Sequence, residues 1–392
     1  MDFDEIIERR STHCAKWDMM DRLYPVPEGR GLPMWIADMD FRPPAAVQAA
    51  LEGIIGQGVY VYFGDDREYL ADIRWWQRTR HGWDVPEGGV FVVHGLVNGT
   101  ALCIDAFTAP GDGVALMTPV YHAFAKVIRA AGRRVVELPL DIGADGRHGF
   151  DPAAWDAAVA GGGVRMFVLC SPHNPGGRVW TAGELRAIAD FAARHDMILV
   201  SDEIHHDLVM PGYRHAPMPL AAPDIADRLV MLTAATKTFN IAGVHTGNVI
   251  IADPGLRARF KARAECMGIS PNAFGMIATT AAYSPEGAAW VDALVGYLDG
   301  NRQLFDEGVN GIPGVRSMPL EATYLAWVDF RATGMDEAEI ARRIEREAGI
   351  AASHGTVFGS GGAGWMRFNL ATPRARVAEA AERLRAAFAD LQ

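Results

Sequence analysis

The chain has 392 residues, of which 49% are hydrophobic and 22% charged, which is typical of a globular protein and excludes a disordered or collagen-like one. Its formal net charge of −11 argues against a nucleic-acid-binding surface or a surface for anionic membranes, because both rely on clustered positive charge. Only four of its basic residues are lysines, Lys16, Lys126, Lys237 and Lys261, so chemistry that needs a primary amine has four candidates.

The start of the chain is acidic and polar and lacks the apolar core of a signal peptide. No apolar stretch reaches the roughly 18 residues needed to cross a bilayer, so we expect a cytoplasmic protein without a membrane partner. The cysteines, Cys14, Cys103, Cys170 and Cys266, form no C-x-x-C pair for a redox or zinc site. We expect them to be reduced and mostly buried.

Short apolar runs alternate with helical patterns from about residue 88 onward. Because the runs show little alternation of apolar and polar residues, they indicate strands that helices cover on both faces, and hence a mainly parallel sheet. The predicted strands are Val90–Val93, Val114–Met117, Arg134–Leu138, Arg165–Cys170, Met197–Ser201, Leu229–Leu232 and Asn248–Ile251. Between two of them, Thr181–His195 has helical spacing, and Thr181 and Glu184 form a capping-box pattern at its start.

The C-terminal third has a different pattern, in which amphipathic helices are separated by short strands. The expected helices are Glu286–Val309, Met335–Ala348 and Arg374–Leu391, and the expected strands are Tyr324–Val328 and Trp365–Asn369. The sequence therefore predicts an α/β protein with a large domain and a smaller α+β domain. We place the large domain at residues 47–285 and assign residues 1–46 and 286–392 to the small domain.

Polar side chains follow three of the predicted strands, at the strand ends where open parallel sheets bind ligands. Asn174, Asp202 and Lys237 are the central ones, and each alone has an ordinary explanation, as a turn residue, a helix cap and a solvated lysine respectively. Together, an amide, a carboxylate and an amine at successive strand ends could hold a pyridoxal phosphate ring. Asn174 would donate to the phenolic oxygen, Asp202 would pair with a protonated ring nitrogen, and Lys237 would form the imine. The other lysines lie in polar or helical settings typical of a surface.

Five motifs point to a known family: Met34–Phe41, Pro172–Trp180, Ser201–His205, Lys237–Gly243 and Arg367–Arg374. In them the sequence resembles, over nearly its whole length, the fold-type I pyridoxal-phosphate enzymes of the class I/II aminotransferase superfamily. The closer resemblance is to the MalY/PatB-type branch of cystathionine β-lyases and cysteine-S-conjugate β-lyases. The resemblance implies a three-layer PLP-transferase-like large domain, the cofactor pyridoxal 5'-phosphate, a small amino-acid substrate and a homodimer with shared active sites.

The resemblance also implies roles for individual residues. Lys237 is expected to be the Schiff-base lysine and to move the Cα proton, and Asp202 to keep the ring nitrogen protonated. Tyr121 would stack on the cofactor ring and join Lys237 as a catalytic residue. Asn174 and His205 would lie near the phenolic oxygen.

The remaining implied residues bind the phosphate or the substrate. Arg367 would bind the substrate carboxylate, because a guanidinium group offers it two parallel hydrogen bonds. Gly95, Leu96 and Val97 open a helix, whose backbone N–H groups would bind the phosphate. The expected substrate-binding residues are Ala37, Asp38, Asn174 and Arg367.

Three positions depart from the family pattern. Ala234 stands where many relatives have a phosphate-binding serine, so Thr233 or Thr236 would replace that hydroxyl. After Gly95 the family usually continues with Val-Val-Pro, whereas this chain has Leu96-Val97-Asn98-Gly99-Thr100, so Asn98 and Thr100 are further candidates for the phosphate. Tyr62 matches the tyrosine that reaches the phosphate of the neighbouring subunit in relatives, although Val61 replaces a glycine beside it, which restricts the backbone there.

These residues favour β-elimination from cystathionine or a cysteine S-conjugate, which gives pyruvate, ammonia and a thiol. Two other functions are compatible with the same residues. One is transamination between an amino acid and a 2-oxo acid. The other, which is less favoured, is a regulatory protein that keeps the cofactor.

Overall fold

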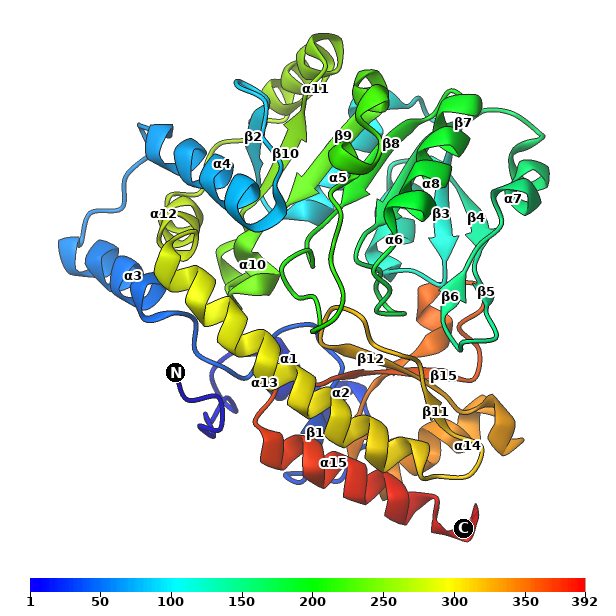
Figure 1. Ribbon diagram of the computed structural model, residues 1–392. Helices are drawn as coiled ribbons and strands as arrows, with labels where there is room; N and C mark the ends of the chain where they lie inside the picture. Colours follow the sequence, from blue (N-terminus) through cyan, green and yellow to red (C-terminus); the bar gives the residue numbers. More distant parts are fainter. Residues whose placement is uncertain (392) are drawn as a thin grey trace.

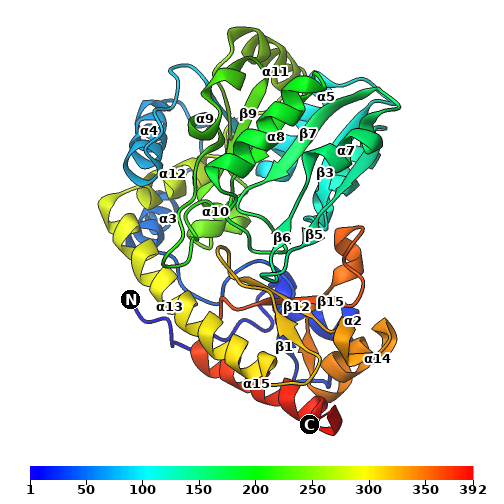
Figure 2. The same ribbon diagram turned by 45° about the vertical axis from the view of Figure 1, so that its right-hand side comes forward.

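The computed structural model describes residues 1–391, which form a larger sheet of seven strands, a smaller sheet of four strands and two short two-stranded sheets, with helices packed around them. The larger sheet lies in the upper half of Figure 1 and the smaller sheet in the lower half. The long helix α13 (Pro285–Asn310) descends from the side of the larger sheet to the smaller one (Figures 1 and 2).

The larger sheet has seven strands in the order β2-β10-β9-β8-β7-β3-β4. Neighbouring strands are parallel from β4 across to β9, whereas β10 is antiparallel to both of its neighbours. The strands are β2 (Val90–Val93), β3 (Gly113–Thr118), β4 (Arg134–Pro139), β7 (Val164–Cys170), β8 (Ile198–Asp202), β9 (Leu229–Thr233) and β10 (Gly247–Ile251). The seven predicted strands and the mainly parallel sheet are therefore confirmed.

Helices cover both faces of this sheet, as its continuous apolar strands predict. In β7, Phe167 and Leu169 pack into one apolar core, while Met166 and Val168 point to the opposite face and pack into another. The first core includes residues of α7 (Pro152–Val159) and α8 (Ala182–Arg194). The second core includes residues of α5 (Leu96–Phe107), α6 (His122–Ala130) and α11 (Pro254–Cys266). The protein thus has the three-layer arrangement expected of the fold.

Helix α8 begins at the capping box that its sequence predicts. The Thr181 hydroxyl accepts a hydrogen bond from the Glu184 N–H, and the Glu184 carboxylate accepts one from the Thr181 N–H. The other elements of this part of the chain are α3 (Ala45–Gln57), α4 (Arg67–His81), α9 (Met218–Ala221), α10 (Ala235–Thr238), α12 (Ala273–Ala282) and the short strands β5 (Asp141–Ile142) and β6 (His148–Gly149).

The smaller sheet is antiparallel and has the order β11-β12-β15-β14. Its strands are β11 (Arg316–Ser317), β12 (Leu325–Asp329), β14 (Ser353–His354) and β15 (Trp365–Asn369). Helices α13 and α15 (Arg374–Ala387) pack against each other beside it. The helix expected at 335–348 is present as α14 (Glu337–Arg342) followed by a π-helical turn (Arg343–Glu347).

The N-terminal segment pairs with the C-terminal third of the chain in a separate two-stranded sheet. It contains α1 (Ala15–Asp18), α2 (Met20–Leu23) and β1 (Leu32–Pro33), which pairs in parallel with β13 (Ile350–Ala351). Helix α3, by contrast, packs on α12 at the side of the larger sheet. We propose on these grounds to keep the division into residues 47–285 and residues 1–46 with 286–392.

The expectation that the cysteines are mostly buried is correct for only two of the four. Cys103 and Cys170 are buried as predicted, but Cys14 is half-buried and Cys266 is exposed. Cys266 lies in the last turn of α11, where it faces solvent, and the Cys14 sulfur accepts a hydrogen bond from Arg9.

Within residues 1–391, no helix combines the length and the apolar character that a membrane span requires.

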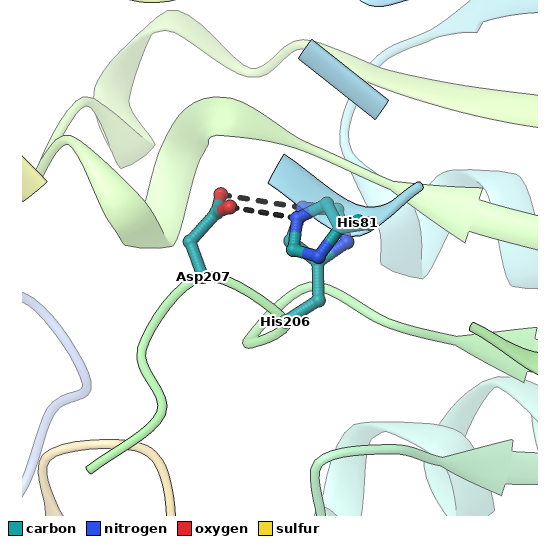
Figure 3. A group of neighbouring side chains, drawn as sticks. All are labelled: His81, His206 and Asp207. Atoms are coloured by element: carbon teal, nitrogen blue, oxygen red, sulfur yellow. Dashed lines mark hydrogen bonds and ion pairs between the residues drawn. The ribbon is translucent and has the colours of Figure 1, made fainter. Parts of the chain in front are cut away.

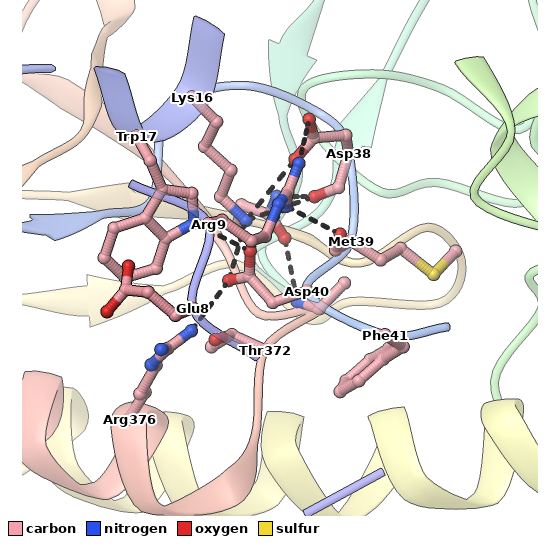
Figure 4. Close-up of polar contacts among 12 residues, drawn as sticks. Glu8, Arg9, Lys16, Trp17, Asp38, Met39, Asp40, Phe41, Thr372 and Arg376 are labelled. Carbon is pink, nitrogen blue, oxygen red and sulfur yellow. Dashed lines mark hydrogen bonds and ion pairs between the residues drawn. The ribbon is translucent and has the colours of Figure 1, made fainter. Parts of the chain in front are cut away.

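The prediction of a surface position is wrong for Lys16, whose side chain is fully buried. Its ammonium lies 3.1 Å from Asp40 Oδ2 and 3.6 Å from Asp38 Oδ1. Arg9 and the Trp17 indole N–H also donate to Asp40 (Figure 4). Local sequence could not show this, because the two acids that enclose Lys16 follow it by more than twenty residues and fold back over it.

Removing the Lys16 charge should destabilise the protein strongly, because it leaves a buried carboxylate without its main partner. We expect Lys16→Met to lower the free energy of unfolding by about 3–5 kcal/mol in urea titrations at pH 7. Lys261→Met is the matched control, since Lys261 is exposed and forms only a surface pair with Glu265; its effect should stay within about 0.5 kcal/mol. Equal effects of the two substitutions would contradict this account.

The same cluster should make the free energy of unfolding depend on pH in the acidic range. Burial alone would raise the pKa of Asp40, but Lys16, Trp17 and Arg9 outweigh it and lower the pKa to about 2. The carboxylate therefore contributes stability that is fully present above about pH 4, the ordinary range for Asp, and is lost as the pH falls towards 2. This loss should be smaller in Lys16→Met than in the wild type.

Candidate active site

A cavity of about 150 Å³ lies at the carboxyl ends of β7, β8 and β9, beside the N-terminus of α5. These strands are neighbours in the sheet, so the residues that follow them converge at one edge. The predicted residues that line the cavity are Ala37, Gly95, Leu96, Val97, Tyr121, Asn174, Asp202, His205, Thr236 and Lys237. The predicted residues that do not line it are Asp38, Tyr62, Thr233 and Arg367.

Lys237 lies on the short helix α10, directly after β9. Its Nζ donates a hydrogen bond to the backbone oxygen of Ala37 at 2.5 Å. Burial and the nearby Arg367 lower the pKa of Lys237 to about 8, although Asp38 and Asp202 oppose the shift. An ordinary lysine is protonated at neutral pH. This one loses its proton far more easily, as a nucleophile or a base requires.

Asp202 is the last residue of β8, and its side chain is buried at the cavity. The only hydrogen bond to its carboxylate from the described residues comes from the Ile204 N–H, at 3.1 Å. Burial and the neighbouring Glu203 raise the pKa of Asp202 to about 7. A buried carboxylate with so few donors is in a suitable state to pair with a cationic group of a ligand.

Asn174 connects the cavity to Arg367. Arg367, on β15 of the smaller sheet, donates through Nη1 to Asn174 Oδ1 at 3.0 Å and through Nη2 to the Trp35 backbone oxygen at 2.7 Å. The oxygen of the Asn174 amide is therefore occupied, which leaves its NH2 group for a ligand. Arg367 Nε is buried without a hydrogen-bond partner among the described residues.

Arg367 thus lies behind Asn174, and a free donor remains on its guanidinium group. The Phe358 ring packs 4.8 Å from the guanidinium carbon and holds its plane. Burial lowers the pKa of Arg367 to about 10, and Tyr121 and Tyr324 oppose the shift. The group remains cationic at neutral pH, so an anionic substrate group is its natural partner.

The N-terminus of α5 supplies a site for an anion. Gly95 caps this helix with φ +84°, a backbone conformation that L residues with a side chain rarely adopt. The N–H groups of the first turn, which include those of Leu96 and Val97, have no partner within the helix and attract negative charge. Thr236 borders the same cavity.

The structure distinguishes between the candidate hydroxyl groups. Thr236 lines the cavity, whereas Thr233 does not, and the Thr233 hydroxyl is buried in the protein without a described partner. Thr100 donates to the Leu96 backbone oxygen within α5, and the Asn98 side chain accepts from the His94 N–H. Thr236 is therefore the hydroxyl best placed to replace the missing serine at Ala234.

Tyr121 and His205 border the cavity from different loops. Tyr121 precedes α6, and its N–H donates to the Asn174 backbone oxygen at 3.0 Å. Burial raises the pKa of the Tyr121 hydroxyl, which therefore stays protonated at neutral pH. Burial and the charge of Lys237 lower the pKa of His205 to about 3, so its imidazole is neutral.

The N-terminal segment 34–41 closes the site from the side of the smaller sheet. Asn240, just after α10, donates to the backbone oxygens of Met39 and Phe41. Asn369, at the end of β15, donates to those of Ile36 and Asp38, each at 2.6 Å. The segment is thus fixed to both sheets.

Asp38 is part of this segment, but its carboxylate is engaged elsewhere. It accepts two hydrogen bonds from Arg9 and lies 3.6 Å from the Lys16 ammonium (Figure 4). A direct role of its side chain in substrate binding has no support in this geometry. The side chain acts instead by holding the segment that brings the Ala37 backbone oxygen to Lys237.

Several lining residues were not expected from the sequence: Phe124, Cys170, Ile204, Ala242 and His245. Most of them lie close in the chain to a predicted residue. Their position near the motifs is therefore the only feature of the sequence that could have identified them as lining residues. The sequence also gave no indication of Trp35 and Ser353, whose backbone oxygen and hydroxyl, respectively, accept hydrogen bonds from Arg367. They belong to segments far apart in the chain.

The residues present suit pyridoxal 5'-phosphate. Its phosphate matches the free N–H groups of α5, its ring nitrogen matches the poorly solvated Asp202, and its phenolic oxygen matches the free NH2 group of Asn174. Its aldehyde matches the amine of Lys237. Each of these groups of the chain is otherwise left without a full set of partners, which is costly in a buried site unless a ligand completes it.

Known proteins with a similar sequence and fold support this description. Cystathionine beta-lyase PatB of Bacillus subtilis is 36% identical over 99% of this chain and 100% of its own length. Cystalysin of Treponema denticola, whose crystal structure contains a pyridoxal 5'-phosphate cofactor, superposes with a TM-score of 0.94 at 34% identity, over 100% of this chain and 99% of its own.

A third relative is the PLP-bound C-S lyase of Staphylococcus hominis, with a TM-score of 0.90 and 28% identity over 100% of this chain and 99% of its own. The profile of the family described as aminotransferase class I and II matches residues 41–384. The match covers most of the sequence, including the three strand ends and Arg367. The chain therefore belongs to the class I and II aminotransferase family.

Proposed function

We propose that the protein is a carbon-sulfur β-lyase that uses pyridoxal 5'-phosphate. It would convert cystathionine or another cysteine S-conjugate, with water, into pyruvate, ammonia and a thiol. The observation that carries this proposal is the convergence of Lys237, Asp202 and Asn174 on one cavity, with Arg367 hydrogen-bonded to Asn174 behind it. The lyases that resemble the chain over its full length give the reaction type.

The cofactor, when bound, supplies an electron sink that makes bonds to the substrate Cα labile. The chain supplies its binding site. The first turn of α5 and Thr236 would bind the phosphate, Asp202 the ring nitrogen, and Asn174 the phenolic oxygen. Tyr121 would cover one face of the ring, in the offset stacking that aromatic rings prefer.

Arg367 would fix the substrate through its α-carboxylate. Its Nη1 and Nη2 are held by Asn174, Trp35 and Ser353, so the planar group is already oriented before substrate arrives. Little rotational freedom is then lost on binding. The carboxylate would accept a hydrogen bond from the donor that remains free on the guanidinium, and its charge would offset the cost of burying that group.

Proton transfer is the task of Lys237 and Tyr121. With a pKa lowered to about 8, the Lys237 amine is close to the pH at which it accepts a proton from the substrate Cα most effectively. The sulfur that leaves from Cβ needs a proton in turn. Tyr121, whose hydroxyl stays protonated at neutral pH, and Lys237 after it has gained a proton are the available donors.

A substrate panel should identify the reaction. Without an added 2-oxo acid, cystathionine and S-alkylcysteines should release pyruvate and a thiol in equal amounts, measured with a lactate dehydrogenase assay and a thiol reagent. Methionine, whose sulfur lies on Cγ, is the matched control and should release no pyruvate. Lys237→Ala should lower the rate roughly 100- to 10,000-fold, since it removes the acid–base group. No pyruvate from any β-thioether, together with amino-group transfer to an added 2-oxo acid, would establish a transaminase instead.

The role of Arg367 can be tested by replacing its guanidinium group with the single ammonium group of a lysine. We expect Arg367→Lys to lower kcat/KM for cystathionine roughly 100-fold, because a change at a buried, hydrogen-bonded charge pair costs about 2–5 kcal/mol. Arg42→Lys is the control, since Arg42 forms an exposed pair with Glu5 and should leave kcat/KM unchanged. An unchanged kcat/KM in Arg367→Lys would exclude this residue as the carboxylate ligand.

We further propose that the protein works as a homodimer. Residues 59–62 form an exposed apolar stretch, in which Val59 is 59% and Tyr62 96% exposed. Contiguous apolar surface of this kind usually marks an interface. Tyr62 is far too exposed to serve the cavity of its own chain, and it does not line it. A second copy that covers this stretch would receive Tyr62 at its own phosphate site.

Hybrid dimers test this proposal. Tyr62→Ala and Lys237→Ala homodimers should both be nearly inactive. After subunit exchange, mixed dimers contain one site in which both residues are intact, so part of the wild-type activity should return. Tyr213→Ala, which alters another exposed tyrosine outside the stretch, should neither lose activity nor depend on mixing. No recovery, with exchange shown by mass spectrometry of differently tagged subunits, would contradict a shared site.

A further inference from the structure

A second group of chemically active side chains lies away from the cofactor cavity. His81 is the last residue of α4, and His206 and Asp207 follow β8 in the same loop as His205. All three are buried, with exposed fractions of 8%, 1% and 6%. Figure 3 shows the two imidazole rings together, facing the Asp207 carboxylate. The proposed lyase reaction uses none of them.

The spacing of their donor atoms suits a metal ion. His81 Nε2 lies 2.8 Å from Asp207 Oδ1, and His206 Nε2 lies 3.3 Å from Asp207 Oδ2. One ligand atom from each of the three residues lies within 4.8 Å of the other two. Ligands of a tetrahedral zinc ion, at about 2.0–2.1 Å from the metal, are roughly 3.3 Å apart. The distance between His206 and Asp207 already matches this spacing, and a small separation of His81 from Asp207 would make room for three bonds to one ion.

His206 lacks the partners that a buried imidazole needs. Its Nδ1 has no hydrogen-bond partner among residues 1–391, and its Nε2 reaches only Asp207, at the long distance of 3.3 Å. A buried imidazole left in this state costs free energy. Coordination of an ion by Nε2 would remove that cost.

Neighbouring side chains hold the carboxylate of Asp207 in place, and a cavity gives an ion access to the three residues. The Trp76 indole N–H and the Thr238 hydroxyl both donate to Asp207, which fixes the carboxylate as outer partners of a metal site do. A cavity of about 240 Å³ is lined by all three residues and by His215, so an ion has an entry path. Two arginines also border this cavity. Arg80 is paired with Asp292 at 2.7 Å, and Arg214 is exposed to solvent.

A neighbouring group, Glu203 with His206 and His215, also has the residue types of a metal site. Glu203 accepts from His215 at 2.7 Å, from the Ser201 hydroxyl and from the Met218 N–H, so its carboxylate is held by hydrogen bonds as that of Asp207 is. Glu203, however, does not line the cavity. The group of His81, His206 and Asp207 is therefore the better site, with His215 or water as a fourth ligand.

We propose that His81, His206 and Asp207 bind one divalent transition-metal ion, with Zn²⁺ as the best match. Two imidazoles and one carboxylate favour this class, whereas Mg²⁺ and Ca²⁺ prefer oxygen ligands alone. The ion would join the end of α4 to the loop that carries Asp202 and His205. It is a structural site, because it lies outside the cavity where the reaction takes place.

Titration of the holoenzyme with zinc chloride alone tests the proposal. After chelator treatment, calorimetry should show one Zn²⁺ per chain in the wild type. His206→Gln and His81→Gln should each weaken binding at least about tenfold, because each removes a direct ligand. His195→Gln is the matched control: His195 forms a similar pair with a carboxylate, Asp156, but at the surface, and its loss should leave the affinity unchanged.

Two results would overturn the proposal: no stoichiometric zinc binding by the wild type, or equal affinities for the wild type and His206→Gln. The absorbance of the bound cofactor and circular dichroism would check that the variants fold. Should a variant fail to fold, Co²⁺ added to the wild type decides the question. Tetrahedral coordination by nitrogen and oxygen gives strong visible absorption bands and supports the site, whereas a spectrum of hydrated Co²⁺ refutes it.

Discussion

The backbone of residues 34–41 links the two sheets, and the site depends on how its carbonyl groups are satisfied. Buried carbonyls need donors, and here the donors come from both sides. Lys237 and Asn240 reach the segment from the larger sheet, and Arg367 and Asn369 reach it from the smaller one. Both charged groups at the active site are therefore oriented by the same stretch of main chain. A shift of this stretch would misplace the amine and the guanidinium together.

Most of the fold could be predicted because its signals are local. Apolar runs without alternation identify strands with two covered faces, and β7 shows the cause, since its side chains enter a different core at each successive position. Asn174, Asp202 and Lys237 could be identified for a related reason. Each directly follows such a strand, and parallel neighbours place their carboxyl ends at one edge.

What the sequence could not provide are the contacts made between distant segments. Lys16 was assigned to the surface because its neighbours are polar, yet Asp38 and Asp40 bury it. The position of Arg367 behind Asn174, and the use of Thr236 but not Thr233, depend on side-chain directions that no local pattern specifies. His81 and His206 are more than a hundred residues apart, so the sequence gives no sign that they meet.

The burial of Lys16 and the site position of Lys237 leave Lys126 and Lys261 as the exposed lysines of the chain. Both lie on helices of the same core, α6 and α11, on the face of the larger sheet opposite α7 and α8. Reagents that attach through surface amines would therefore modify one side of the molecule, together with the N-terminus. Dyes, surfaces or cross-linkers coupled through these two lysines alone would hold the protein by one face and leave the smaller sheet free of lysine conjugates.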